Sequence, residues 1–153
     1  MQIETKVLRD ITVIEKELNS ITSGVIMLPL DDDVEQIATN FIYHDKNVYI
    51  YIQDKELYDN LKLNTGTMFT AIKESASSRK SKKDNETIYS LFYISVSGIL
   101  KKIAEKKLKN IIRQSFIQKY TGQLIDPDNK SKSFSRLVVL DTEEMIATEE
   151  TGS

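Results

Sequence analysis

The sequence contains no cysteine and a single histidine, His44, and these two scarcities exclude much metal and covalent chemistry. Without a thiol the chain cannot form a disulfide, a thiolate zinc site, a cysteine-bound iron–sulfur cluster or a cysteine nucleophile. One imidazole excludes a histidine-rich metal site, and we expect no bound metal. With only 5 Gly and 2 Pro, the chain is neither collagen-like nor disordered throughout.

Long apolar runs are also missing. The longest, residues 24–30, falls far short of the ~20 residues that span a bilayer, and the first ten residues carry charges throughout. We therefore expect a cytoplasmic protein with no membrane partner. The length of 153 residues is enough for one domain with a substantial core, and we expect a single domain over residues 1–153.

Charge is nearly balanced, at a net −2, but it is unevenly distributed. Cations predominate in residues 79–119, whereas both flanking segments are acidic. This basic segment is either a site for phosphate or nucleic acid, or a solvated loop followed by a lysine-rich helix face. Aromatic residues are not interleaved with the cations and the pI is about 5.5, which argues against nucleic acid.

The first half of the chain shows both helical and strand periodicities. A helix of about four turns is predicted to open the chain, because apolar residues recur at steps of four and three: Ile3, Val7, Ile11, Ile14 and Leu18. Strands are predicted over residues 24–30, 35–43 and 48–53. The polar residues 44–47 have hairpin-loop length, so the last two strands are expected to pair.

The second half alternates strands with two helices. Asp54 is a candidate N-cap for a short helix over 54–63, followed by a strand over 67–73 and a mobile Ser/Lys-rich loop over 74–87. A long strand over 89–100 is expected to bend at Gly98, and a helix over 108–120 to end at Gly122. After a polar turn at 126–129, strands are predicted over 134–140 and 145–148, before a frayed tail at 149–153.

This order of elements predicts a mainly β protein with flanking helices, of the α+β class. Strand and helix do not alternate regularly, which favours an antiparallel sheet of six or seven strands closed into a barrel.

The order and three segments resemble the FMN-binding split-barrel family, of which pyridoxamine 5'-phosphate oxidase is the best-known type. The segments are the hairpin FIYHDKNVYIYI with the short helix DKELYDNL, the strand TMFTAIK, and the late strand YISVSGIL leading through a helix to FSRLVVLDTEE. Within them, Ser97-Gly98 and Asn60-Leu61 are similar to dipeptides of many members. The resemblance covers nearly the whole chain and implies a split β-barrel.

The resemblance further implies a homodimer with two FMN sites in clefts between subunits. The flavin phosphate is held in family members by basic and hydroxyl side chains, because a dianion needs cationic or N–H donors. We accordingly predict a cofactor-binding set of Thr39, Asn40, Gln53, Lys55, Asn60 and Lys73.

The chain departs from the family pattern in its charges. Residues 35–43 contain no cation, and Lys55 is followed by Glu56. Either Lys55, Lys73 and the pair Arg79-Lys80 supply the missing charge, or the pocket is degenerate and holds something else. The C-terminal TEEMIATEETGS lacks the basic and histidine residues that grip a second phosphate, which disfavours pyridoxamine phosphate oxidase activity itself.

Two function hypotheses remain open. The first is a flavoprotein or oxidoreductase of unknown substrate, in which the flavin carries the redox chemistry and no catalytic side chain can be named. The second is a non-catalytic binding or regulatory split-barrel protein that has lost FMN, with a haem-handling variant included.

Three further features carry alternative interpretations. Tyr43, Tyr49 and Tyr51 either stack on an isoalloxazine ring or pack as half-buried strand residues. His44 is either a general base, haem ligand or metal ligand, or a solvated turn residue. The acidic run at 31–33 lacks the spacing of a calcium loop and is interpreted as a connection between strands.

Overall fold

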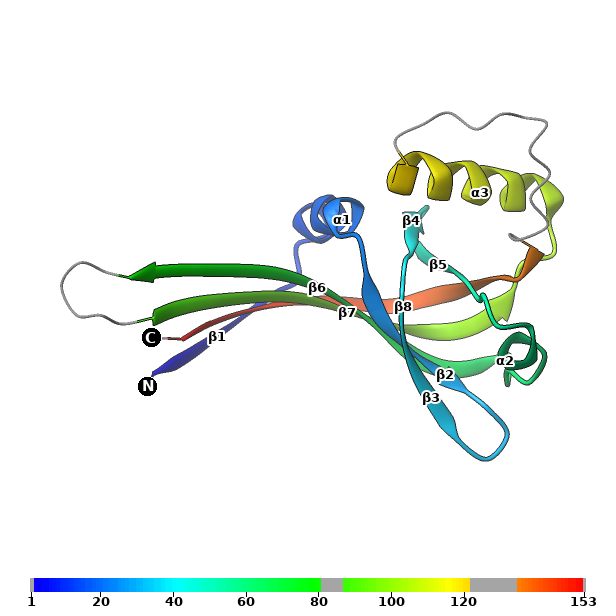
Figure 1. The fold of residues 1–153 in the computed structure, drawn as a ribbon, viewed down its shortest axis with the longest axis horizontal. Coiled ribbons are helices and arrows are strands. Elements are labelled where there is room, and N and C mark those ends of the chain that lie inside the picture. The colour runs from blue at the N-terminus through cyan, green and yellow to red at the C-terminus, as the bar shows by residue number, and fades with distance from the viewer. Residues whose placement is uncertain (1, 81–86, 122–134, 153) are drawn as a thin grey trace.

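In the part of the chain that the structure describes, a curved, eight-stranded antiparallel sheet with three helices forms the fold (Figure 1). The computed structural model describes residues 2–80, 87–121 and 135–152. The strands are β1 (Ile3–Leu8), β2 (Gly24–Pro29), β3 (Val34–Thr39), β4 (Ile42–His44), β5 (Asn47–Tyr51), β6 (Thr65–Lys80), β7 (Thr87–Lys102) and β8 (Leu137–Gly152), and the helices are α1 (Ile11–Ser20), α2 (Lys55–Asp59) and α3 (Lys106–Thr121).

The sheet order is β3-β2-β6-β7-β8-β5-β4, with β1 pairing on the outer part of β8. The three 16-residue strands β6, β7 and β8 run side by side through the molecule (Figure 1). At one end they continue with β1 past α1, and at the other the sheet curls into a half-barrel beneath α3. This is a split β-barrel of the α+β class, as the resemblance implies, and the sheet has eight described strands rather than the predicted six or seven.

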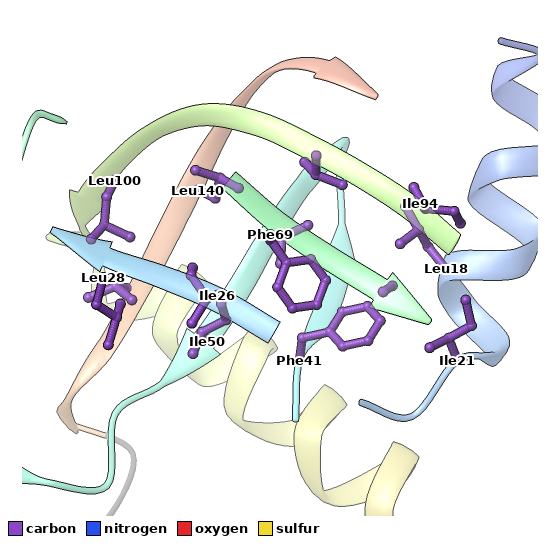
Figure 2. Close-up of a cluster of buried hydrophobic side chains, with 14 of the residues drawn as sticks. Leu18, Ile21, Ile26, Leu28, Phe41, Ile50, Phe69, Ile94, Leu100 and Leu140 are labelled. Atoms are coloured by element: carbon purple, nitrogen blue, oxygen red, sulfur yellow. The ribbon is translucent and has the colours of Figure 1, made fainter. Parts of the chain in front are cut away.

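The inner face of the curled sheet holds the larger core. Residues from β2, β5, β6, β7 and β8 alternate into it, and α1 adds Ile14 and Leu18. The rings of Phe41 and Phe69 pack against each other in this core, with their centroids 4.7 Å apart and their planes tilted by 57° (Figure 2). A second buried cluster joins α3, through Ile112 and Phe116, to strands β4, β5 and β8.

The bend of the long strands occurs at Gly98. Ser97 pairs with Glu144 and Gly98 with Thr142, so Glu143 is an extra residue in β8 and forms a bulge. A Cβ atom at Gly98 would lie 2.1 Å from the carbonyl oxygen of Asp141. The bend predicted at Gly98 is confirmed, and its cause is the close approach of the β8 backbone.

The predicted opening helix is wrong over its first half. Residues 3–8 form β1 and pair with residues 147–152 of β8, and a helix begins only at Ile11. Asp10 is its N-cap, and its carboxylate accepts a hydrogen bond from the Thr12 N–H at 2.9 Å. Tertiary pairing with the far end of the chain overrides the local helical spacing, and Ile3 and Val7 stay more than half exposed.

The elements between residues 34 and 59 follow the prediction, except that one predicted strand is divided. The strand predicted over 35–43 is two strands, β3 and β4, and the hairpin turn is the two residues Asp45 and Lys46, both with positive φ. The short helix is confirmed, with Asp54 as its cap.

Toward the C-terminus the sheet is longer than predicted. Residues 74–80, predicted within a loop, lie in β6, while 81–86 fall outside the described residues. The two last strands and the residues 149–152 of the predicted frayed tail form the one strand β8, paired on both sides. The predicted stop at Gly122 and the turn at 126–129 lie outside the described residues. Among the helices that are described, none is both long and apolar enough to cross a membrane.

Replacing Gly98 by alanine should destabilise the fold by about 3 kcal/mol, because the β8 backbone must move to admit the methyl group. Gly66 provides the matched control, since a Cβ there meets nothing closer than the Gly98 carbonyl oxygen at 4.0 Å. Urea unfolding of both variants is the measurement. Equal stability of Gly98→Ala and Gly66→Ala would contradict the proposed cause of the bend.

Candidate functional site

A cleft of about 800 Å³ opens between the edge strand β3, the end of β5 and the two helices α2 and α3. We call it the main cleft. Its lining combines apolar side chains with hydroxyl, amide and carboxylate groups, and comprises Ser23, Glu35, Ile37, Ala38, Thr39, Asn40, Tyr51, Ile52, Gln53, Asp54, Leu57, Phe116, Ile117, Tyr120 and Thr121. A cavity of this size lies within the range of small-molecule and cofactor sites.

The last turns of α3 form one wall of the main cleft. Ile112 and Phe116 anchor the helix by packing with Ile42, Tyr49 and Leu137 in the second buried cluster. The sequence favours this placement because the apolar residues of α3 recur at helical spacing and form one stripe. Phe116 and Ile117 thereby present apolar surface to the cleft.

The Tyr120 hydroxyl ties this wall to the barrel. It accepts a hydrogen bond from the Phe41 N–H at 2.9 Å and lies within hydrogen-bonding distance of two carbonyl oxygens, that of Thr22 at 2.7 Å and that of Phe41 at 2.9 Å. Burial raises the pKa of Tyr120, and the hydrogen bond to Phe41 opposes part of that rise. One hydroxyl thus fixes α3 to the segments that precede β2 and β4.

Arg136 holds the residues at the end of β5, which line the side of the cleft away from α3, through hydrogen bonds. Its Nε donates to the Ile52 carbonyl at 2.9 Å, and its Nη2 donates to the Gln53 carbonyl at 2.8 Å and to the Tyr51 hydroxyl at 2.9 Å. The guanidinium carbon also lies 5.5 Å from the centroid of the Tyr51 ring. Arg136 therefore orients three successive residues that line the main cleft.

The charges of the lining are acidic. Glu35 and Asp54 contribute carboxylates, and no lysine or arginine lines the cleft among residues 2–80, 87–121 and 135–152. One carboxylate oxygen of Asp54 accepts the N–H groups of Glu56 and Leu57 at the start of α2. The remaining polar groups are neutral hydroxyls and amides, so the cleft offers hydrogen bonds without a strong positive field.

The six predicted cofactor-binding residues divide into two groups. Thr39, Asn40 and Gln53 all line the main cleft, so the structure brings these three together. The other three, Lys55, Asn60 and Lys73, are absent from its lining and contact other parts of the protein.

Each of these three residues contacts a group outside the cleft. Lys55 forms an exposed ion pair with Asp59 at 3.3 Å, and Lys73 pairs with Glu17 at 3.0 Å. The Asn60 side-chain amide donates to the Glu56 carbonyl at the end of α2. The side chains of residues 79 and 80, the other suggested source of charge, lie outside the described part of the structure.

The three candidate stacking tyrosines have different environments. Tyr51 lines the main cleft, whereas Tyr49 is 3% exposed in the second buried cluster. Tyr43 donates its hydroxyl to the Glu15 carboxylate at 2.8 Å, and burial together with this contact raises its pKa. Only Tyr51 is placed to contact a ring in the cleft.

His44 and the acidic run at 31–33 lie in connections. His44 precedes the β4–β5 turn, with its ring 6.2 Å from that of Tyr49, and it does not line the main cleft. Asp33 accepts a hydrogen bond from the Val34 N–H in the β2–β3 connection. Within the described residues, no three acidic or histidine side chains are grouped to hold a metal ion.

Sequence reasoning missed the roles of Tyr120 and Arg136. The sequence predicts only that Tyr120 ends the helix over 108–120 and that Arg136 lies in the strand over 134–140. Their partners lie 79–98 and 83–85 positions away in the chain, so local patterns carried no signal for these contacts.

Comparison with solved structures supports the fold. No protein-family model matches the sequence, and no curated protein matches it. A candidate 5-nitroimidazole antibiotic resistance protein from Bacteroides thetaiotaomicron aligns over 100% of this chain and 93% of its own, with a TM-score of 0.70 and 12% identity.

Two further structures have the same architecture, and one of them is described as a cofactor-binding protein. A candidate pyridoxamine 5'-phosphate oxidase from Corynebacterium glutamicum aligns over 95% of this chain and 98% of its own, with a TM-score of 0.60 and 17% identity. A FAD and haem binding protein from Mycobacterium smegmatis aligns over 93% of this chain and 72% of its own, with a TM-score of 0.62 and 12% identity. The chain therefore shares the split-barrel fold of flavin-binding proteins.

Replacing Tyr120 by phenylalanine should lower the free energy of unfolding by about 2 kcal/mol, because the part-buried N–H and carbonyl groups of Phe41 lose their partner, and the exposed Thr22 carbonyl loses its contact as well. Tyr58→Phe is the control, since the Tyr58 ring rather than its hydroxyl meets Lys102. Chemical denaturation compares the two. A Tyr120→Phe protein as stable as Tyr58→Phe would show that the hydroxyl does not hold α3.

Proposed function

We propose that this protein is a homodimeric flavoprotein that binds FMN or a related flavin in the main cleft. The observation that carries this proposal is the composition of the cleft, in which an aromatic ring and apolar side chains lie beside a row of hydroxyl and amide groups. The FAD and haem binding protein that shares the fold supports the same ligand class.

The apolar part of the lining fits a flat ring system. Ile37, Leu57 and Ile117 are partly exposed and supply surface that a ring would remove from water, while the buried Ile52 and Phe116 lie behind it. Arg136 fixes the Tyr51 phenol by a hydrogen bond at 2.9 Å, so the ring of Tyr51 is oriented before a ligand enters.

The polar part fits the hydroxylated chain of a flavin better than its phosphate. Thr39, Asn40 and Gln53 offer neutral donors and acceptors, whereas Glu35 and Asp54 repel a dianion. Arg136 is the cation beside the cleft, and its Nε and Nη2 atoms already donate to carbonyl oxygens. We therefore propose that the ring, and not the phosphate, dominates affinity.

In the proposed site the flavin would supply the electron transfer, and the protein would bind and orient it. The α3 wall, through Phe116 and Ile117, would exclude water from one side of the ring. Gln53 and Asn40 would hydrogen-bond its polar substituents. An oxidoreductase activity on an unknown small substrate is the corresponding reaction class.

The outer face of the barrel supports the homodimer. On β2 and β6, side chains alternate between the core and the outside, and Met27, Met68 and Ile72 point outward with 39% of each exposed. Adjacent exposed apolar side chains on a sheet are typical of surfaces that meet a partner.

Filling the cleft should abolish flavin binding. Ala38 is exposed on β3 and lines the cleft, so Ala38→Trp places a large ring in the ligand volume without disturbing the core. Fluorescence titration with riboflavin and FMN should show binding of both to the unmodified protein, within about threefold of each other.

The control variants separate the cleft from its surroundings. Gln114→Trp adds the same ring at an exposed position of α3 outside the cleft, and Lys55→Ala removes an exposed cation. Both should bind flavin as the unmodified protein does. Failure of the unmodified protein to bind any flavin would overturn the proposal, and a loss of affinity in Lys55→Ala would contradict this placement of the site.

A charge on the outer face should dissociate the proposed dimer. We expect light scattering after gel filtration to give a dimer for the unmodified protein and a monomer for Met68→Lys. Ile111→Lys is the control, because Ile111 is 48% exposed on α3, away from β6. A monomeric unmodified protein would refute the homodimer.

A second candidate function is a binding or regulatory protein without flavin. The two carboxylates and the absence of a lining cation in the described residues favour it. Its haem-handling form has less support, because the only histidine in the sequence lies outside the main cleft. Absorption spectra distinguish the flavoprotein, the haem-handling protein and the protein without either cofactor. Flavin and haem give different visible bands, and a protein that binds neither gives no visible band.

A further inference from the structure

A second, smaller cavity lies across the Phe41 backbone from the main cleft. Its volume is about 310 Å³, and it is lined by residues of α1, β4 and α3: Asn19, Ile42, Tyr43, Ser115, Gln118 and Lys119. Its residues differ from those of the main cleft, although Lys119 and Tyr120 are neighbours on α3. The proposed flavin function does not use this cavity.

The amine of Lys119 lies against an aromatic ring and a backbone carbonyl group rather than in solvent. Its Nζ lies 3.9 Å from the centroid of the Phe41 ring and donates to the Phe41 carbonyl at 3.2 Å. It also lies 5.5 Å from the centroid of the Tyr120 ring. These contacts fix the end of a flexible side chain against aromatic and backbone surface beside the cavity.

No carboxylate lines this cavity among the described residues. On the α1 side, the lining residue is the neutral Asn19, and the Glu15 carboxylate accepts the hydroxyl proton of Tyr43. On α3, the other lining groups are the Ser115 hydroxyl and the Gln118 amide. Desolvation therefore acts on Lys119 without a compensating ion pair in the lining, and it lowers the pKa of the amine to about 8.

We propose that Lys119 is the reactive amine of a second small-molecule site, which captures small aldehydes as imines. The Nζ atom bonds to the carbonyl carbon, and the carbonyl oxygen leaves as water with the two protons of the neutral amine. A desolvated lysine is activated for this chemistry because a larger share of it is unprotonated near neutral pH. The small volume restricts the ligand to short chains, whose polar ends Asn19 and Gln118 can hydrogen-bond.

Reductive trapping tests the proposal on the intact protein. Propionaldehyde and cyanoborohydride at pH 7.5 convert each imine to a stable propylamine, which peptide mass spectrometry locates. Lys119 should be modified at least about tenfold faster than Lys101 or Lys73. These two are internal controls, because each ammonium lies beside a carboxylate, at 2.7 Å from Asp141 and 3.0 Å from Glu17.

Three further measurements make the result decisive. The Lys119 rate should saturate with aldehyde concentration and should rise as the pH is raised from about 6 toward about 8. It should fall in Ser115→Leu, which fills the cavity, but not in Ser115→Ala. A linear concentration dependence would mean a reactive amine without a binding site and would overturn the proposal. Modification of Lys119 no faster than Lys101 would also overturn it, whatever the result of the flavin titration.

Discussion

The hydrogen bonds of the Tyr120 hydroxyl determine whether this half-barrel has a binding cleft. The sheet alone would leave the edge of β3 and the end of β5 open, and α3 supplies the missing wall. Apolar packing around Phe116 decides which face of α3 is buried, but such packing is not directional. The directional contacts to Phe41 and Thr22 set where its last turn lies, and the same Phe41 carbonyl accepts the Lys119 amine of the second cavity.

Curvature of the long strands provides the rest of the scaffold. At Gly98 the β7 and β8 backbones approach too closely for any side chain, and the bulge at Glu143 turns β8 so that its first residues reach β5. Arg136, just before β8, then meets the residues after β5. The bend in β8 and the position of Arg136 just before it therefore both contribute to the orientation of Tyr51 in the main cleft.

The sequence predicted the features that depend on local chemistry. The cap Asp54, the β4–β5 hairpin and the bend at Gly98 each follow from a few adjacent residues, and all three are confirmed. The β1 strand was mistaken for helix because its partner lies at the other end of the chain. Resemblance placed Thr39, Asn40 and Gln53 in a common site, but Lys55 and Lys73 pair with carboxylates outside it. Asp59 lies four residues after Lys55, a helical spacing that indicates this pair, whereas Glu17 is 56 positions from Lys73 and no local pattern reveals it.

The central claim is that the cleft between β3, β5 and α3 receives a flat aromatic ring. Amide NMR spectra recorded during a titration with riboflavin test this claim residue by residue. The account predicts saturable shifts concentrated at Thr39, Asn40, Gln53 and Thr121, with little change at Lys55 or on the outer face of β6. Shifts absent at high riboflavin concentration, or confined to residues outside the main cleft, would contradict it.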